Sequence, residues 1–254
     1  GQLRHWVGCE APRPRVQPEG IIVPLEIEEK LQVHSSRVFD RIRQDGHVAR
    51  LPIRRGRLVV QHDTYLDTPG GLLYREGASL RLREKDGRVS LTLKTPVEGA
   101  RVRNEEEDFL TEEQADDARG GMLHHVASAV ATSAVAYAGT PDLVPILSAR
   151  NQRETWHLTS HRGCAKLCFD WVHYASAFDG ADTAAAEEYE LEVELQQGPR
   201  SLVAEVAQSL SRRYGLAPQT QSKYERGAAL TGAFDMGSAH ALLALARAPA
   251  LAAV

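Results

Sequence analysis

The sequence is poor in several features, and each shortage excludes a class of protein. Only three cysteines occur in 254 residues, and this odd number without a repeated spacing is untypical of disulfide-rich secreted domains. No stretch reaches the roughly 18 consecutive apolar residues of a membrane-spanning helix, and residues 1–20 lack the apolar core of a signal peptide. The formal net charge is −4, whereas nucleic-acid-binding domains are usually basic. We therefore expect a cytoplasmic protein without a nucleic-acid or membrane partner.

Length and composition allow one large domain. The chain is 43% hydrophobic, which suffices for a sizeable core, and a β-barrel often fills a chain of this length by itself. We expect residues 1–20 to be a disordered lead-in and residues 21–230 to form the domain. Residues 231–254 are rich in alanine, and we expect this tail to be helical or disordered.

Apolar and polar residues alternate with a period of two in eight segments, which is the pattern of β-strands with one buried face. The eight segments are residues 25–31, 58–66, 79–84, 89–95, 101–110, 151–159, 165–174 and 188–195. Helical patterns occupy residues 35–44, 122–137 and 201–214. The pair Asp86-Gly87, between the third and fourth strand segments, predicts a tight hairpin. The sequence therefore indicates a mainly β, α+β protein.

The polar face of several predicted strands carries charges of one sign. Arg81 and Arg83 alternate with leucines, and Glu190, Glu192 and Glu194 form a row on another strand. Side chains in such a row share one face and repel one another unless an opposite charge binds there. A solvated outer face is the simpler interpretation for any single strand. Because the helices need apolar strand faces to pack on, we instead expect an eight-stranded antiparallel β-barrel with helices packed outside and the charges lining a tunnel.

A tunnel with both acidic and basic rows suits one class of ligand. Phosphate oxygens bind Lys and Arg, whereas Mg²⁺ and Mn²⁺ bind carboxylate and phosphate oxygens. A metal ion that bridges Glu and phosphate allows both rows to surround one polyanion. The pattern therefore predicts a small polyphosphate as the ligand and Mg²⁺ or Mn²⁺ as the cofactor.

Short motifs in a fixed order give the sequence a family resemblance. The series begins with Glu26-Ile27-Glu28-Glu29-Lys30, a Glu-x-Glu-x-Lys motif. The later motifs are Tyr65-Leu66-Asp67-Thr68, Leu80-Arg81-Leu82-Arg83, Leu91-Thr92-Leu93-Lys94, Arg103-Asn104-Glu105-Glu106-Glu107, Glu190 to Leu195, and Ser222-Lys223. Taken in this order, the motifs resemble the CYTH domain, or triphosphate tunnel metalloenzyme, family, and its bacterial inorganic triphosphatases in particular.

The resemblance implies a tunnel that binds triphosphate, and it implies roles for individual residues. The implied phosphate-binding residues are Lys30, Arg81, Arg83, Lys94, Arg103, Arg153 and Lys223. The implied metal ligands are Glu26, Glu28, Glu105, Glu107, Asp170, Glu190, Glu192 and Glu194. The implied catalytic residues are Tyr65 and Lys94 as an acid–base pair and Glu192 as the group that orients water. Tyr65 is equally compatible with a role in the tunnel wall alone.

Several activities stay open, and inorganic tripolyphosphate is the favoured substrate. Class IV adenylate cyclases of the family carry a His-Phe pair ahead of the first motif, where this sequence has Glu19-Gly20-Ile21-Ile22. Animal thiamine triphosphatases carry a stacking Trp at the position that aligns with Ser79. Both differences favour a substrate that needs only charge. The alternative of another class is a polyphosphate-binding module without turnover, and the sequence is compatible with a monomer or a homodimer.

Overall fold

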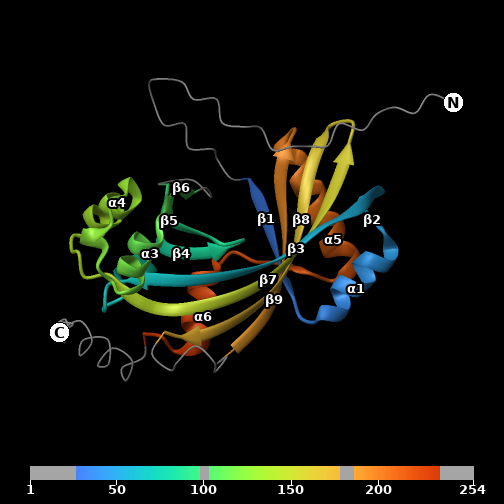
Figure 1. The fold of residues 1–254 in the computed structure, drawn as a ribbon. Coiled ribbons are helices and arrows are strands. Elements are labelled where there is room, and N and C mark those ends of the chain that lie inside the picture. Colours follow the sequence, from blue (N-terminus) through green and yellow to red (C-terminus); the bar gives the residue numbers. More distant parts are fainter. Residues whose placement is uncertain (1–26, 98–102, 178–185, 235–254) are drawn as a thin grey trace.

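The computed structural model describes residues 27–97, 103–177 and 186–234, which form a mainly β fold with helices around it (Figure 1). The strands are β1 (Glu28–Val33), β2 (His47–Val48), β3 (Leu51–Asp67), β4 (Ser79–Lys85), β5 (Arg88–Pro96), β6 (Arg103–Leu110), β7 (Val144–Ser160), β8 (Gly163–Ser176), β9 (Ala186–Gln197) and β10 (Ala217–Pro218). The helices are α1 (Ser36–Asp45), α2 (Leu72–Arg75), α3 (Glu112–Arg119), the 3-10 turn η1 (Leu123–His125), α4 (Ala129–Ala138), α5 (Arg200–Tyr214) and α6 (Lys223–Thr231). None of these helices is long and apolar enough to cross a membrane. The predicted lead-in, residues 1–20, and most of the predicted tail lie outside the described residues.

The strands form one antiparallel sheet, which confirms the predicted fold class. Their order is β10-β1-β9-β8-β7-β3-β4-β5-β6, and β2 pairs with β3 at one side. Each of the eight predicted segments corresponds to one of the long strands, and β2 and β10 add two residues each. Within the described ranges no ladder joins β6 to β1 or β10, so the tunnel has one seam without backbone hydrogen bonds.

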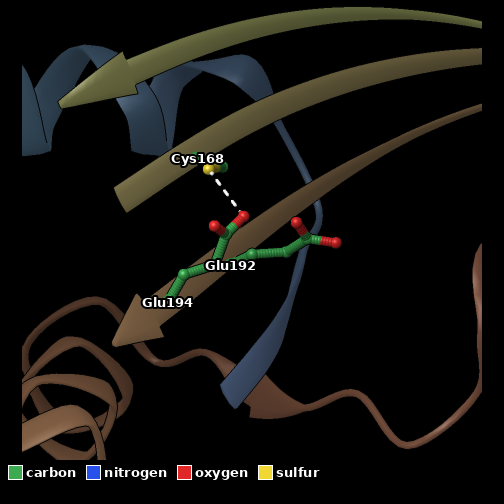
Figure 2. A group of neighbouring side chains, drawn as sticks. All are labelled: Cys168, Glu192 and Glu194. Carbon is green, nitrogen blue, oxygen red and sulfur yellow. Dashed lines mark hydrogen bonds between the residues drawn. The ribbon is translucent and has the colours of Figure 1, made fainter. Parts of the chain in front are cut away.

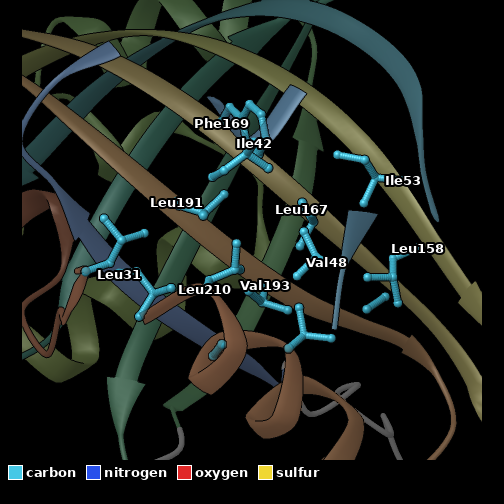
Figure 3. Packing of buried hydrophobic residues seen from close by; sticks show 14 of the residues in the cluster. Leu31, Ile42, Val48, Ile53, Leu158, Leu167, Phe169, Leu191, Val193 and Leu210 are labelled. Carbon is cyan, nitrogen blue, oxygen red and sulfur yellow. The ribbon is translucent and has the colours of Figure 1, made fainter. Parts of the chain in front are cut away.

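Helices α1 and α5 cover the outer, apolar face of the sheet over β1, β8 and β9. Figure 3 shows how Ile42 of α1 and Leu210 of α5 pack on Leu31, Leu191 and Val193 of these strands. All five side chains are buried, and removing each from water contributes about 2 kcal/mol to folding. The apolar residues of the period-two pattern therefore point outward, toward the helices, as predicted.

Helices α3 and α4 cover the outer face at the other side of the sheet, over β4 and β5. Leu80 and Leu82 of β4 are buried in the same cluster as Ala134 of α4. The predicted helix over residues 122–137 is divided, because Ser128 has extended backbone angles and caps a new helix. Its hydroxyl accepts hydrogen bonds from the amides of Val130 and Ala131, which fixes the start of α4 at Ala129.

Helix α6 was not predicted, and it lies on the inner face of the sheet. Figure 1 shows it close to β9 and apart from the other helices. Its Tyr224 packs in one cluster with Leu147 of β7 and Tyr174 of β8, which share the inward parity of the charged rows. Gly227 makes this close approach possible, since a Cβ there would lie 2.6 Å from Leu147 Cδ2 and 2.6 Å from Tyr174 Cδ1. The first turn of α6 therefore points into the tunnel.

Candidate active site

One cavity of about 1430 Å³ occupies the inner face of the sheet. Its wall contains inward-facing residues of all eight long strands and of the segment that begins α6. All the predicted phosphate-binding residues line it, namely Lys30, Arg81, Arg83, Lys94, Arg103, Arg153 and Lys223. The cavity exceeds the volume of about 300–1,000 Å³ that small-molecule sites usually have, so it is large enough for a small charged ligand.

On the β3–β4 side of the cavity, two arginines share one buried carboxylate. Arg83 forms a two-point ion pair with Asp63, with Nε and Nη2 each 2.7 Å from a carboxylate oxygen. Arg81 Nη1 lies 3.9 Å from the same Asp63, and Arg81 Nε is buried without a hydrogen-bond partner among the described residues. Burial raises the pKa of Asp63, but Arg83 and Arg81 outweigh it and hold this pKa below its ordinary value. The pair of arginines therefore has one positive charge more than its partner neutralises.

The β5–β6 side carries mixed charges. Lys94 Nζ lies 3.1 Å from Glu105 Oε2, and Glu107 accepts a hydrogen bond of 2.9 Å from the Ser90 hydroxyl. Arg103, at the start of β6, pairs at 3.3 Å with Glu225 of α6. This ion pair links β6, the last strand in the order of the sheet, to the helix on its inner face.

The β7–β9 side holds a dense ionic network around Arg153. Arg153 forms a two-point ion pair with Asp170, at 2.7 and 2.6 Å, and also contacts Glu192 and Glu194. Asp170 and Glu192 are buried. Burial raises the pKa of Glu192, yet Arg153, Lys223 and Lys30 hold it well below its ordinary value. These cations therefore keep the Glu192 carboxylate ionised.

Lys223, the first residue of α6, is the second cation in this network. Its ammonium contacts Asp170 at 2.9 Å, Glu192 at 2.6 Å, and Glu190. Burial lowers the pKa of Lys223, but the three carboxylates raise it well above the ordinary value. Burial also raises the pKa of Glu190, to about 7. Lys223 thus lies among the carboxylates as an internal counter-ion.

Cys168 lies beside the carboxylates of β9 (Figure 2). Its thiol donates a hydrogen bond of 3.2 Å to Glu194 Oε1, while Lys166 contacts Glu194 Oε2 at 2.5 Å. Burial raises the pKa of the Cys168 thiol well above its ordinary value. Cys168 therefore stays a neutral thiol that donates to Glu194. Metal ligation and nucleophilic chemistry both require the thiolate, so neither role is assigned to Cys168.

The predicted metal ligands fall into two groups. Ligand oxygens of Asp170, Glu190 and Glu192 lie within 4.8 Å of one another, but the first two residues are buried behind the wall and Lys223 neutralises them. Those that line the cavity are Glu28, Glu105, Glu107, Glu192 and Glu194. These carboxylates are hard oxygen donors and fit Mg²⁺ or Mn²⁺. Glu26 lies outside the described residues.

The predicted catalytic residues Tyr65, Lys94 and Glu192 all line the cavity. Tyr65 stands opposite Arg81 in the β3–β4 register. Burial raises the pKa of Tyr65, and Asp63 raises it further, so the hydroxyl is protonated at neutral pH. Glu106, between Glu105 and Glu107 on β6, points outward instead, and its carboxylate accepts a hydrogen bond from Ser133 of α4.

Four residues of the site were not predicted from the sequence. Asp63 and Lys166 belong to the predicted period-two strands, and inward parity was the signal that could have found them. Tyr224 and Arg226 belong to α6. Arg226 pairs with Glu188 at 2.7 Å and with Glu190 at 2.5 Å. The signal for this helix was the Ser-x-x-Glu capping motif of Ser222, which the structure shows as a capping box.

Comparison with known proteins gives one family and a group of similar structures. The model of the CYTH domain family matches residues 24–228. None of the curated proteins matches the chain. An adenylate cyclase candidate from Bacillus halodurans has 23% identity and a TM-score of 0.58, over 80% of this chain and 96% of its own. An adenylyl cyclase candidate from Hippeastrum with a dominant triphosphatase activity has 19% identity and a TM-score of 0.59, over 81% and 96%. At these identities the two structures show a shared fold.

Proposed function

The chain belongs to the CYTH domain family, and from this premise we propose that it is a metal-dependent triphosphatase that hydrolyses inorganic tripolyphosphate. The observation that carries the proposal is that basic and acidic side chains line different sides of one cavity. On the β4 side Arg81 and Arg83 share a single carboxylate, while Glu192 and Glu194 face the same cavity from β9. A polyphosphate with a bound divalent metal ion needs both kinds of wall.

Phosphate binding is proposed for the cations that line the cavity. Arg81 and Arg83 are the strongest candidates, because planar guanidinium groups match phosphate oxygens and no residue in the described ranges accepts a hydrogen bond from Arg81 Nε. Lys30, Lys94, Arg103, Arg153 and Lys223 are proposed to complete the set. Phosphoryl transfer depends mainly on positioning and charge neutralisation, and both follow from fixed cations around the chain of phosphates.

Metal binding is proposed for Glu28, Glu192 and Glu194, with Glu105 and Glu107 on the other side of the cavity and Glu26 next to the first strand. Bound Mg²⁺ or Mn²⁺ supplies charge neutralisation at the phosphate oxygens and lowers the pKa of water. In this proposal the carboxylate of Glu192, held ionised by its cationic neighbours, accepts a hydrogen bond from the attacking water and orients it.

Tyr65 and Lys94 are proposed as the acid–base pair for the leaving phosphate. Both line the cavity. Burial raises the pKa of Tyr65, so its hydroxyl keeps a proton that it can donate to the oxygen that leaves. Lys94 is held by Glu105. The absence of an aromatic ring at Ser79 supports an inorganic substrate over thiamine triphosphate, since nothing at that position can stack on a heterocycle.

A substrate panel tests the proposal. Phosphate release is measured from tripolyphosphate, thiamine triphosphate, ATP and longer polyphosphate, each with Mg²⁺, Mn²⁺ or EDTA. We expect release from tripolyphosphate with either metal and none with EDTA. Arg83→Ala and Glu28→Gln should abolish turnover while the circular dichroism spectrum stays unchanged. The control Arg37→Ala, on the exposed side of α1, should leave turnover unchanged.

Two other results would assign the protein differently. Tight binding of tripolyphosphate without phosphate release under any condition would identify a polyphosphate-binding module. Preferential turnover of thiamine triphosphate, or formation of cyclic AMP from ATP, would move the protein to another activity of the same family.

A further inference from the structure

Tyr65 has an unusual environment for a buried tyrosine. Its side chain is 4% exposed and lines the cavity. The charged groups that influence it are Asp63, Arg81, Arg83 and Lys223, which places the hydroxyl among the proposed phosphate-binding residues. Among the described residues this hydroxyl has no hydrogen-bond partner, and it is not one of the fully buried side-chain atoms without a partner, so it is accessible from the cavity. The hydroxyl is therefore free to donate to a ligand in the cavity.

The ring of Tyr65 is held from one side by Tyr224 of α6. The two rings stack with centroids 4.9 Å apart and an angle of 13° between their planes. Tyr224 is buried, and Tyr74 packs edge-on against it at 6.0 Å. The stack therefore joins a strand of the tunnel wall to the helix that enters the tunnel.

Tyr224 is itself fixed by a rigid acceptor. Its hydroxyl donates a hydrogen bond of 2.7 Å to Asp67 Oδ2. The Asp67 carboxylate also accepts hydrogen bonds from the backbone amides of Thr68, Leu73 and Tyr74, at 2.6, 2.9 and 2.8 Å. The Thr68 hydroxyl also donates to Asp67, at 3.4 Å. Because three of the five donors are backbone amides, the position of Asp67 is set by the fold. Asp67 therefore fixes the position of Tyr224, and Tyr224 in turn fixes the ring of Tyr65.

We propose that Tyr224 is a positioning residue that holds the Tyr65 ring so that its unpaired hydroxyl points at the substrate in the cavity. The inference rests on the proposed function of Tyr65. A tyrosine ring turns about two side-chain bonds, and losing its stacking partner opens space into which it can rotate. Displacement of a catalytic group by about 1 Å can cost roughly 100-fold in rate, so a shift of the ring should lower kcat more than it changes KM.

Steady-state kinetics on tripolyphosphate with Mg²⁺ test this proposal. Tyr224→Leu removes the stack, and we expect kcat to fall at least about tenfold with KM changed by less than about twofold. Tyr224→Phe keeps the stacked ring but loses the hydrogen bond to Asp67, so its kcat should lie between those of the wild type and Tyr224→Leu. In a Tyr65→Phe background Tyr224→Leu should have no further effect on kcat, because coupled residues are not additive.

A matched control separates positioning from general loss of stability. Phe39 and Phe169 form an equivalent stack in the outer core, with centroids 4.8 Å apart and planes at 11°. Phe39→Leu should lower Tm as Tyr224→Leu does and leave kcat unchanged. Equal loss of kcat in both Leu variants, or a further loss in the Tyr65→Phe background, would overturn the proposal. Turnover by the wild type tests the proposed function alone. If the wild type does not hydrolyse tripolyphosphate, both the proposed function and this inference are contradicted.

Discussion

Arg83 and Asp63 face each other across β4 and β3 and form a two-point ion pair in which both contacts measure 2.7 Å. Arg153 and Asp170 make the same arrangement across β7 and β8. The tunnel thus contains two guanidinium groups, each fixed in place by a buried aspartate. An arginine whose orientation is fixed in advance loses less conformational entropy when it binds phosphate.

The first prediction concerns Asp63. Asp63→Asn leaves Arg83 with a neutral partner, and breaking a buried ion pair destabilises a protein by about 3–5 kcal/mol. The pKa of Asp63 is lowered in the folded protein, so its contribution is present above the pKa of the unfolded state and is lost as pH falls through the folded value. Thermal unfolding should show a lower Tm for the variant at pH 7 and a shrinking difference as the pH is lowered from 5 toward 2. A difference that stays constant over this range would contradict the assignment.

The second prediction concerns Lys223. Lys223→Met removes a buried cation from the carboxylates of Asp170, Glu190 and Glu192, and we expect a loss of about 3–5 kcal/mol. Ligand oxygens of these three residues lie within 4.8 Å of one another, so a divalent ion can replace the ammonium. Mg²⁺ or Mn²⁺ should therefore raise the Tm of the variant more than that of the wild type, measured against EDTA.

Arg37→Met serves as the control for Lys223→Met, because it also removes one cation but from an exposed position. It should change neither Tm nor the response to metal ions. An equal metal response in wild type and Lys223→Met would show that the carboxylate group does not accept a metal ion.

The third prediction concerns Gly227. Gly227→Ala places a methyl group 2.6 Å from both Leu147 Cδ2 and Tyr174 Cδ1, and overpacking of this kind costs about 1–3 kcal/mol. Better helix propensity offsets up to about 1 kcal/mol of this cost. Urea unfolding should therefore show a net loss of stability. Ala229→Gly, at an exposed position of the same helix, measures the propensity contribution separately, and a stabilised Gly227→Ala protein would mean that α6 does not approach the wall so closely.

The fourth prediction concerns Cys168. Because its thiol is buried and burial raises its pKa, we expect iodoacetamide to leave it unmodified in the native protein at pH 8. The same residue should react once the protein is unfolded in urea. Peptide mass spectrometry reads each cysteine separately, and rapid native labelling of Cys168 would show that this part of the wall opens to solvent.

Much of the fold was predictable because alternation reports directly on which face of a strand is buried. Leu80 and Leu82 face the helices while Arg81 and Arg83 face the cavity, as their order in the sequence indicates. Helix α6 was missed, since it buries Lys223 and Arg226 as well as apolar residues, and an apolar periodicity therefore does not mark its buried face.

The ionic partners of the site were not predictable from sequence. Asp63 meets Arg83 only because the register of β3 and β4 places them opposite each other. Lys223 meets Asp170 only because α6 folds back into the tunnel, 53 residues after Asp170 in the chain. Sequence motifs identified which residues carry charge, whereas three-dimensional contacts decide which carboxylates are already neutralised and which face the cavity.

Helix α6 also has a consequence for synthesis on the ribosome. Lys223 and Arg226 neutralise Asp170, Glu188 and Glu190, yet they are translated after every long strand of the sheet. A nascent chain that has only just completed β9 has its inner carboxylates without these two partners. The sheet therefore reaches its final charge balance only when the end of the domain has left the ribosome. Shortened chains that stop before Lys223 should remain incompletely folded.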